Sequence, residues 1–544
     1  MERNDLLYLV IKRFAEMDLH PQQVTNIEMG YIFEELIRRF SENAEAGDHY
    51  TPREVIRLMV HLLFNEEDTL SIEGITQTIY DCAAGTGGMG SVSQEYMEKQ
   101  NSTGELIFFA QEVNEESYAI AKADLLIKGE EADNIRLGNT LTDDKFKGRT
   151  FDFMISNPPY GVDWKKIEKK VKSEHTDLGF NGRFGPGLPR TSDGQLLFLL
   201  HLISKMKPVT KAEPNGSRIA IIMNGSPLFT GDAGSGESEI RRYLFENDLV
   251  EGIVAMPNDL FYNTGIGTYI WILTNKKTVE KRGKVTLVNA VDYYKKMKKS
   301  MGNKRSQIDP TQIDEIVALY SSVKESKTVK IFENEDFGYH KITVERPLRL
   351  NFQLSAERIE LIKLEKAFQN LATSKKKGEG KDQQISEGKL LQKQILDVLI
   401  ANQSSVLVKN CEVFTNQIKS LFKKEGIVIG VPVFKVLLNA LSEKDETADI
   451  CMKNKNTMEV DTELRDTESI PLNEDIQEYF EREVLPHVPD AWIDESKTKI
   501  GYEVPFTRNF YEYTPLRNSK EILSEILALE QEIDNQLKKV FGNG

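Results

Sequence analysis

Short apolar runs alternate with amphipathic stretches through the first half of the chain. Helical spacing of apolar residues predicts helices between most of these runs, for example at 118–128 and 195–206. Strands that alternate with helices form parallel βαβ units with right-handed crossovers. We therefore expect an α/β fold with one doubly wound, Rossmann-like sheet of seven strands, at 78–81, 106–111, 135–137, 151–156, 218–223, 250–255 and 269–273.

The pattern divides the chain into three parts. Apolar residues recur at helical spacing in 1–48, which we expect to form a helical segment. The α/β pattern occupies 49–350, where Thr51 is a suitable N-cap and Pro52 suits the first turn of a helix over 52–64.

Residues 351–544 are predicted to be mainly helical and to contact other subunits. Within them, 443–475 contains eleven acidic and four basic residues, so we expect this stretch to be exposed and flexible. The last helix, 520–541, is amphipathic, with a stripe formed by Ile522, Ile526, Leu529, Ile533 and Leu537.

Composition narrows the possible partners. The 544 residues carry a net charge of −15, which excludes nucleic-acid binding through net positive charge and requires a local basic surface for any polyanion. No run of about 18 apolar residues predicts a membrane span, and the charged N-terminus does not resemble a signal peptide. Cys82, Cys411 and Cys451 lie far apart, so we expect no metal site, no disulfide framework and a reducing, cytoplasmic location.

The first predicted strand ends in a glycine-rich turn, Asp81-Cys-Ala-Ala-Gly-Thr-Gly-Gly88. Glycines allow the backbone to bend tightly and to approach a ligand at the carboxyl end of a parallel strand. The next strand ends near Glu112, a carboxylate placed to accept ribose hydroxyls. An acidic residue at the start of the turn and the absence of a following lysine argue against a phosphate ligand. These features favour S-adenosylmethionine over NAD.

The fourth predicted strand leads into Asn157-Pro158-Pro159-Tyr160. Two prolines fix a rigid, extended turn. The Asn157 side chain and the Pro158 carbonyl can accept both N–H bonds of an exocyclic adenine amine, which localises its lone pair for attack on a methyl group. Tyr160 offers a ring on which an extruded base can stack.

Together these motifs resemble the modification subunits of type I restriction–modification systems, of the N6-adenine DNA methyltransferase family. The resemblance also includes Gly47-Asp-His-Tyr-Thr-Pro-Arg-Glu-Val55, ahead of the glycine turn as in the gamma group, and Phe261-Tyr-Asn-Thr-Gly-Ile266. Relatives carry a longer helical region before the segment equivalent to 1–48.

The resemblance implies a set of cofactor residues. In the family the segment with Tyr50, Thr51 and Pro52 closes over the methionine end of S-adenosylmethionine. The resemblance also implies that the glycine turn and the next two strand ends contact the cofactor. The residues implied there are Asp81, Ala83, Gly85, Thr86, Gly87, Glu112, Asn114 beside the Glu112 carboxylate, and Asn139.

The resemblance also implies partners. These are double-stranded DNA, a specificity subunit, a second modification subunit and a restriction subunit. We expect phosphate contacts from two lysine runs, represented by Lys165, Lys166, Lys169, Lys170, Lys295 and Lys296. The first run follows the Asn-Pro-Pro-Tyr tetrapeptide directly.

Two alternatives stay open at this point. Asn-Pro-Pro-Tyr also occurs in enzymes that methylate a glutamine amide of a protein, although such enzymes are small and lack the upstream Tyr-Thr-Pro-Arg. A scaffold subunit could keep the fold without catalysis, against which the intact Asp81, Glu112 and Asn157 argue.

Overall fold

The computed structural model describes residues 6–16, 51–211, 214–262, 264–322, 324–374, 379–513 and 518–541. Within them the chain divides into two compact units, residues 1–337 with 502–544 and residues 338–501. Of the expected helical segment 1–48, helix α1 (Leu6–Ala15) is described, and the rest lies outside the described residues, except Glu16. No helix among the described residues is both long and apolar enough to cross a membrane.

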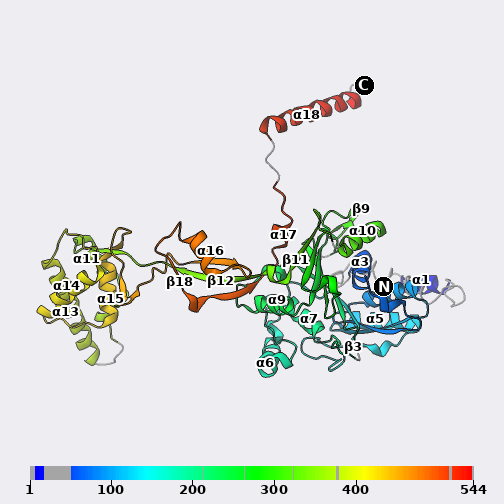
Figure 1. Ribbon diagram of the computed structural model, residues 1–544, viewed down its shortest axis with the longest axis horizontal. Helices are drawn as coiled ribbons and strands as arrows, with labels where there is room; N and C mark the ends of the chain where they lie inside the picture. The colour runs from blue at the N-terminus through cyan, green and yellow to red at the C-terminus, as the bar shows by residue number, and fades with distance from the viewer. Residues whose placement is uncertain are drawn as a thin grey trace. The chain divides into compact units, whose positions relative to one another are not determined.

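The first unit is built on a nine-stranded sheet with the order β11-β8-β6-β7-β5-β4-β1-β2-β3 (Figure 1). Its central strands are almost wholly buried, which explains why most of their residues are apolar. The strands are β1 (Thr76–Asp81), β2 (Glu105–Glu112), β3 (Ile135–Leu137), β4 (Phe153–Ser156), β5 (Arg218–Asn224), β6 (Val250–Ala255), β7 (Thr268–Thr274), β8 (Lys284–Asn289) and β11 (Val329–Glu333).

All seven predicted strands are therefore confirmed, with two corrections. The sheet also contains β8 and β11, and β7 runs antiparallel to both β5 and β6. No helix lies between β6 and β7, so the chain turns back directly instead of crossing over.

Helices surround this sheet, and the predicted helices over 52–64, 118–128 and 195–206 are present as α3, α5 and α7. Pro52, not Thr51, is the N-cap of α3, and no side chain caps that helix. A hairpin of β9 (Lys295–Met301) and β10 (Lys304–Gln307) stands beside the sheet. The helices of this unit are α3 (Arg53–Leu63), α4 (Gly88–Gln100), α5 (Glu115–Lys128), α6 (Glu168–Leu178), α7 (Gln195–Ile203), α8 (Ser226–Phe229), α9 (Gly236–Glu246), α10 (Pro310–Ser321), α17 (Phe506–Asn509) and α18 (Ser519–Phe541).

The second unit contains more strand than we expected. Its four-stranded sheet joins β17 (Asp466–Pro471), β12 (Gly338–Glu345), β18 (Trp492–Ile493) and β19 (Lys499–Tyr502). Helices enclose a separate apolar core that includes Phe352, Phe414 and Leu437. They are α11 (Ala356–Ile362), α12 (Lys366–Gln369), α13 (Glu379–Ala401), α14 (Cys411–Lys424) and α15 (Val431–Ala440), and α16 (Ile476–Tyr479) lies beside the sheet.

Strands form within the stretch 443–475, for which we expected little regular structure. The stretch contributes β17, and also β14 (Ser442–Lys444), β15 (Met452–Asn454) and β16 (Thr457–Met458), with β14 paired to β13 (Leu350–Phe352). Its charges are held by ion pairs such as Lys444 with Asp461 at 2.8 Å. We expected no disulfide framework, but the structure pairs Cys411 with Cys451 in a disulfide, with 5.4 Å between their Cα atoms. Forty residues separate them, so their spacing did not indicate the pairing.

Candidate active site

The site lies where the order of the parallel strands reverses. β1 pairs with β2 on one side and with β4 on the other, so their carboxyl ends face the crevice in which open α/β sheets bind ligands. Ser156, the last residue of β4, donates from its hydroxyl to Asp81 Oδ1 at 2.7 Å. The two predicted motifs, which begin at Asp81 and Asn157, are thus joined through one side chain.

The glycine turn has the backbone that its sequence predicts. Gly85 and Gly87 have φ values of +53° and +85°, in the left-handed region that favours glycine. The Gly85 N–H donates to Glu112 Oε2 at 2.7 Å, so the predicted ribose carboxylate does lie beside the turn. Glu112 Oε1 accepts from the amides of Val113 and Asn114 at 2.8 and 2.7 Å. A carboxylate has about four lone-pair sites, and three are used here, so Glu112 Oε2 can accept from one further donor.

A small pocket opens between the turn, the start of α3 and the end of β4. Five residues predicted from the sequence lie in its wall, namely Thr51, Asp81, Ala83, Thr86 and Asn157. The sequence reasoning missed the other lining residues, which are Ile56, Ala84, Gly88 and Met89. Pro52 lies next to this wall as the N-cap of α3, and Tyr50 lies outside the described residues.

The two ends of the Asn157 amide have different surroundings. Its Nδ2 donates to Thr51 Oγ1 at 2.9 Å. Its Oδ1 is inaccessible to solvent and has no hydrogen-bond partner among the described residues. A buried acceptor without a donor is costly, so this atom is suited to receive an N–H from a ligand.

Tyr160 is packed against the main core of the first unit. Its ring meets the ring of Phe261 edge-on, with centroids 6.4 Å apart and planes at 82°. Burial raises the pKa of the Tyr160 phenol, although the neighbouring Asn157 side chain acts in the opposite direction, and the phenol stays neutral. Only the family resemblance points to the segment of Phe261, and no periodicity in the sequence indicates this contact. Pro158 is buried and Pro159 is exposed.

Asn114 and Asn139 are accounted for by local bonds. Asn114 Oδ1 accepts from the Ser117 amide at 2.9 Å and caps α5. Asn139 Oδ1 accepts from the Leu141 amide at 3.0 Å in the loop after β3. Neither side chain lines the pocket.

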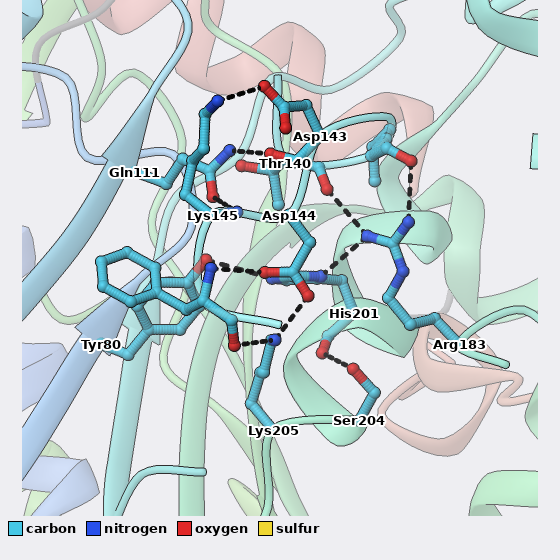
Figure 2. Close-up of polar contacts among 12 residues, drawn as sticks. Tyr80, Gln111, Thr140, Asp143, Asp144, Lys145, Arg183, His201, Ser204 and Lys205 are labelled. Carbon is cyan, nitrogen blue, oxygen red and sulfur yellow. Dashed lines mark hydrogen bonds and ion pairs between the residues drawn. The ribbon is translucent and has the colours of Figure 1, made fainter. Parts of the chain in front are cut away.

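A buried polar network that the sequence did not indicate supports the loop after β3 (Figure 2). Arg183 uses all five of its N–H donors. Two hold the Glu174 carboxylate at 2.9 and 2.6 Å, two reach the carbonyls of Thr140 and Leu141 at 2.7 and 2.9 Å, and one reaches His201 Nδ1 at 3.1 Å. Only a guanidinium has this many donors in a fixed plane.

The network extends from the loop to β1. Because Arg183 can only donate, His201 Nδ1 accepts and its ring proton lies on Nε2, 3.1 Å from the Tyr80 hydroxyl. Burial lowers the pKa of His201, with Arg183 and Lys205 acting in the same direction, so the ring is neutral. Thr140 Oγ1 donates to the Cys82 carbonyl at 2.5 Å. The loop after β3 is thereby fixed against the first residues of the glycine turn.

The Asp81 carboxyl has an unusual charge state. It is 1% exposed, and burial raises its pKa to about 7, although hydrogen bonds from the Ala83 amide and the Ser156 hydroxyl act in the opposite direction. No cationic side chain of the described residues forms an ion pair with it. A cationic ligand in the pocket would stabilise the ionised carboxylate and lower its pKa.

The two lysine runs occupy different places. Lys165, Lys166, Lys169 and Lys170 are exposed on the 3₁₀ turn Lys165–Ile167 and on α6. Lys295 and Lys296 are exposed on β9, where Lys295 forms an ion pair with Asp309.

The hairpin that carries the second run is bonded to the segment of Phe261. The Asn303 amide donates to the Tyr262 carbonyl at 2.9 Å, and the Arg305 amide donates to the Asp259 carbonyl at 2.9 Å. The hairpin is therefore connected through this segment to the ring of Tyr160.

Known proteins similar to this chain belong to the family that the Asp81–Gly88 and Asn157–Tyr160 motifs resemble. The family model of the N-6 DNA methylases matches residues 25–348. The methylase subunit of the type I restriction enzyme MjaIX from Methanocaldococcus jannaschii is 28% identical over 369 residues, which cover 67% of this chain and 61% of that protein. The methylase subunit of HindI from Haemophilus influenzae is 26% identical over 266 residues, covering 48% and 54% of the two chains.

A solved structure is also similar. The type I restriction–modification methyltransferase subunit from Streptococcus thermophilus matches with 25% identity and a TM-score of 0.49, over 60% of this chain and 64% of that one. The chain spans about half to three-fifths of the length of the curated relatives named above.

Proposed function

Because this chain belongs to the N-6 DNA methylase family, we propose that it transfers a methyl group from S-adenosylmethionine to N6 of an adenine in double-stranded DNA. We propose that it does so as the modification subunit of a type I restriction–modification complex. The observation that carries this proposal is the unpartnered, buried Oδ1 of Asn157 in the wall that also holds Asp81 and Thr86.

The residues of the pocket fit S-adenosylmethionine. Asp81 is a buried carboxyl suited to the cationic amino group, the glycine turn admits a close ligand, and Glu112 retains one site for a ribose hydroxyl. When bound, the cofactor supplies an electrophilic methyl group. Ala83, Gly85, Thr86 and Gly87 form the turn against which it would lie.

This assignment predicts a pH dependence. Binding of the cationic amino group requires ionised Asp81, whose pKa in the free protein is about 7. Affinity for S-adenosylmethionine is therefore expected to rise as the pH increases through 7, by about tenfold between pH 6 and pH 8. Titration calorimetry over this range measures the change. Asp81→Asn should bind more weakly at pH 8 and lose the dependence, whereas the same slope in Asp81→Asn would place the titrating group elsewhere.

The raised pKa of Asp81 also affects the free energy of unfolding. This effect decreases as the pH rises, whereas the affinity for the cofactor increases. The pKa of Asp81 in the folded chain lies above the ordinary value for aspartate, 3.8, so the folded chain binds the proton more tightly than the unfolded chain. This contribution favours folding at low pH and is lost as the pH rises from about 4 to 7.

The target amine is held by acceptors of the chain. Asn157 Oδ1 and the Pro158 carbonyl accept its two N–H bonds, which draws the nitrogen toward tetrahedral geometry and localises its lone pair. The nitrogen would form a bond to the methyl carbon as the sulfonium–methyl bond breaks and leaves its electron pair on sulfur, and the nitrogen would then lose one proton to solvent. No strong base is required, because the positively charged product amine is acidic.

Tyr160 is proposed to stack on the extruded adenine. Tyr160→Ala is expected to lower kcat/KM for duplex DNA by about 10- to 100-fold, which corresponds to a stacking loss of about 1–3 kcal/mol. Tyr160→Phe keeps the ring and its edge-on contact with Phe261, so its kcat/KM should stay within about threefold of the wild type. Steady-state kinetics of both variants test this, and equal damage by the two substitutions would assign the role to the hydroxyl.

The duplex is proposed to contact the exposed lysines of both runs. The hairpin run has the more direct connection to the target base, because its backbone is bonded to the segment that carries Phe261. Lys296 on the hairpin, with Lys165, Lys166, Lys169 and Lys170 near α6, offers charge for phosphates. Lys295 would have to leave its ion pair with Asp309 to contribute.

A specificity subunit, a second modification subunit and a restriction subunit are the proposed partners, as the relatives' description as subunits of type I restriction enzymes suggests. We propose that helix α18 provides the surface that contacts the specificity subunit. The five residues of its stripe are 42–58% exposed.

The molecule that accepts the methyl group distinguishes DNA methylation from the two alternatives, which are glutamine methylation of a protein and a scaffold without catalysis. Incubation with methyl-labelled S-adenosylmethionine, duplex DNA and a specificity subunit should transfer label to DNA. Label in a protein fraction would favour glutamine methylation, and no transfer to either would favour a scaffold.

A further inference from the structure

We propose that Thr51 is a positioning residue for Asn157, an inference that rests on the proposed function. The Thr51 hydroxyl oxygen accepts from Asn157 Nδ2 at 2.9 Å. This contact occupies the end of the amide that has nothing to offer an amine, because an N–H cannot accept an N–H. The other end, Oδ1, is left buried and without a partner among the described residues.

The hydroxyl of Thr51 has no other structural duty among the described contacts. The sequence predicted that it caps α3, but Pro52 is the N-cap and α3 has no side-chain cap bond. Threonine at the helix start is therefore explained by Asn157 and not by the helix. Thr51 and Asn157 also share the wall of the pocket.

Thr51 is well placed to fix the orientation of the Asn157 amide, because the two residues that begin α3 just after it are bonded to two different parts of the unit. Arg53 donates to Glu95 of α4 at 2.9 Å, and α4 is the helix that follows the glycine turn. Glu54 pairs with Lys304 of β10, which is 3% exposed and also donates to the Leu260 carbonyl at 2.9 Å. The segment is thus held to the cofactor side and to the segment of Phe261 at once.

This role differs from the one that the resemblance implies. A residue that closes over the cofactor would change the affinity for S-adenosylmethionine. A residue that orients Asn157 changes the rate of methyl transfer, because a rotated amide presents Nδ2 in place of Oδ1 to the target amine. The two roles separate cleanly in a binding constant and a rate constant.

The test uses Thr51→Val, which has nearly the same shape but no hydroxyl, and Thr51→Ser, which keeps it. Single-turnover methyl transfer to duplex DNA, with the full chain and a specificity subunit, should slow by about 10- to 100-fold in Thr51→Val. The Kd for S-adenosylmethionine should stay within about twofold, and Thr51→Ser should recover to within about threefold of the wild-type rate. In an Asn157→Ala background, Thr51→Val should have no further effect, because the residue through which it acts is gone.

Thr274→Val is the matched control. Thr274 is 1% exposed and donates to the Ser217 carbonyl at 2.9 Å. It pairs with Arg218, the first residue of β5, and so lies at the end of that strand remote from the site. Its loss should lower the melting temperature and leave the single-turnover rate unchanged. A tenfold weaker Kd with an unchanged rate in Thr51→Val, or additive effects with Asn157→Ala, would overturn the positioning role. Absence of methyl transfer in the wild type would instead overturn the proposed function itself.

Discussion

Asn157→Ala is expected to lower the rate of methyl transfer by about 10²- to 10³-fold and to leave the affinity for S-adenosylmethionine within about twofold of the wild type. The substitution removes Oδ1, the one buried acceptor of the pocket without a partner among the described residues. We propose that this atom accepts from the target amine and does not contact the cofactor. Single-turnover kinetics and titration calorimetry on the same preparation separate the two effects.

A control for general damage is available in the second unit. Asn410 caps α14 by accepting from the Val413 amide at 3.0 Å. Asn410→Ala should cost about 1 kcal/mol of stability without changing the rate. If Asn157→Ala weakened cofactor binding as much as it slowed transfer, Asn157 would belong to the cofactor site alone.

Deletion of residues 518–544 is expected to abolish co-purification with the specificity subunit and site-specific methylation while the affinity for S-adenosylmethionine is retained. The deleted residues carry helix α18, whose five-residue stripe is about half exposed. Full burial of an exposed side chain of this size is worth about 1.5–3 kcal/mol, so covering the exposed half of each one contributes roughly half of that to the interface. A helix laid in a groove uses anchors with this spacing.

Two paired substitutions localise the effect on the helix. Ile526→Lys with Ile533→Lys places charges on the stripe, whereas Ser524→Lys with Gln531→Lys places the same charges on the opposite, exposed face. Only the first pair should prevent complex formation in a pull-down. A truncated chain that still forms the complex would show that α18 is dispensable, and one that loses cofactor binding would show that α18 packs on its own unit.

The strands of the large sheet were predictable because a strand buried on both faces is mainly apolar. β4 and β6 are buried at every residue, and they are mainly apolar in the sequence except for Ser156 and Glu251. The buried Glu251 carboxylate forms an ion pair with Arg218. The antiparallel direction of β7 was not predictable, since a buried strand looks the same in either direction. The strands of the second unit were missed because they are half exposed and charged, as in β17, where one residue of six is buried.

Some residues of the candidate site were predictable from the sequence, and some of its contacts were not. Asp81, the glycine turn, Glu112 and Asn157 stand at strand ends, where local sequence determines what meets in space. The contact of Thr51 with Asn157 spans 106 residues, and that of Arg183 with Thr140 spans 43. Neither leaves a periodic trace in the sequence, because each depends on a single hydrogen bond made after folding.

The proposed reaction is methylation of adenine N6 in DNA at the pocket beside Asp81 and Asn157. Its most direct test is nucleoside analysis by mass spectrometry of a duplex incubated with the chain, a specificity subunit and deuteromethyl-labelled S-adenosylmethionine. We expect labelled N6-methyladenine with the wild type, at least 100-fold less at equal times with Asn157→Ala, and none when the cofactor is omitted. Labelled cytosine, or labelled N6-methyladenine formed equally fast by Asn157→Ala, would contradict the account.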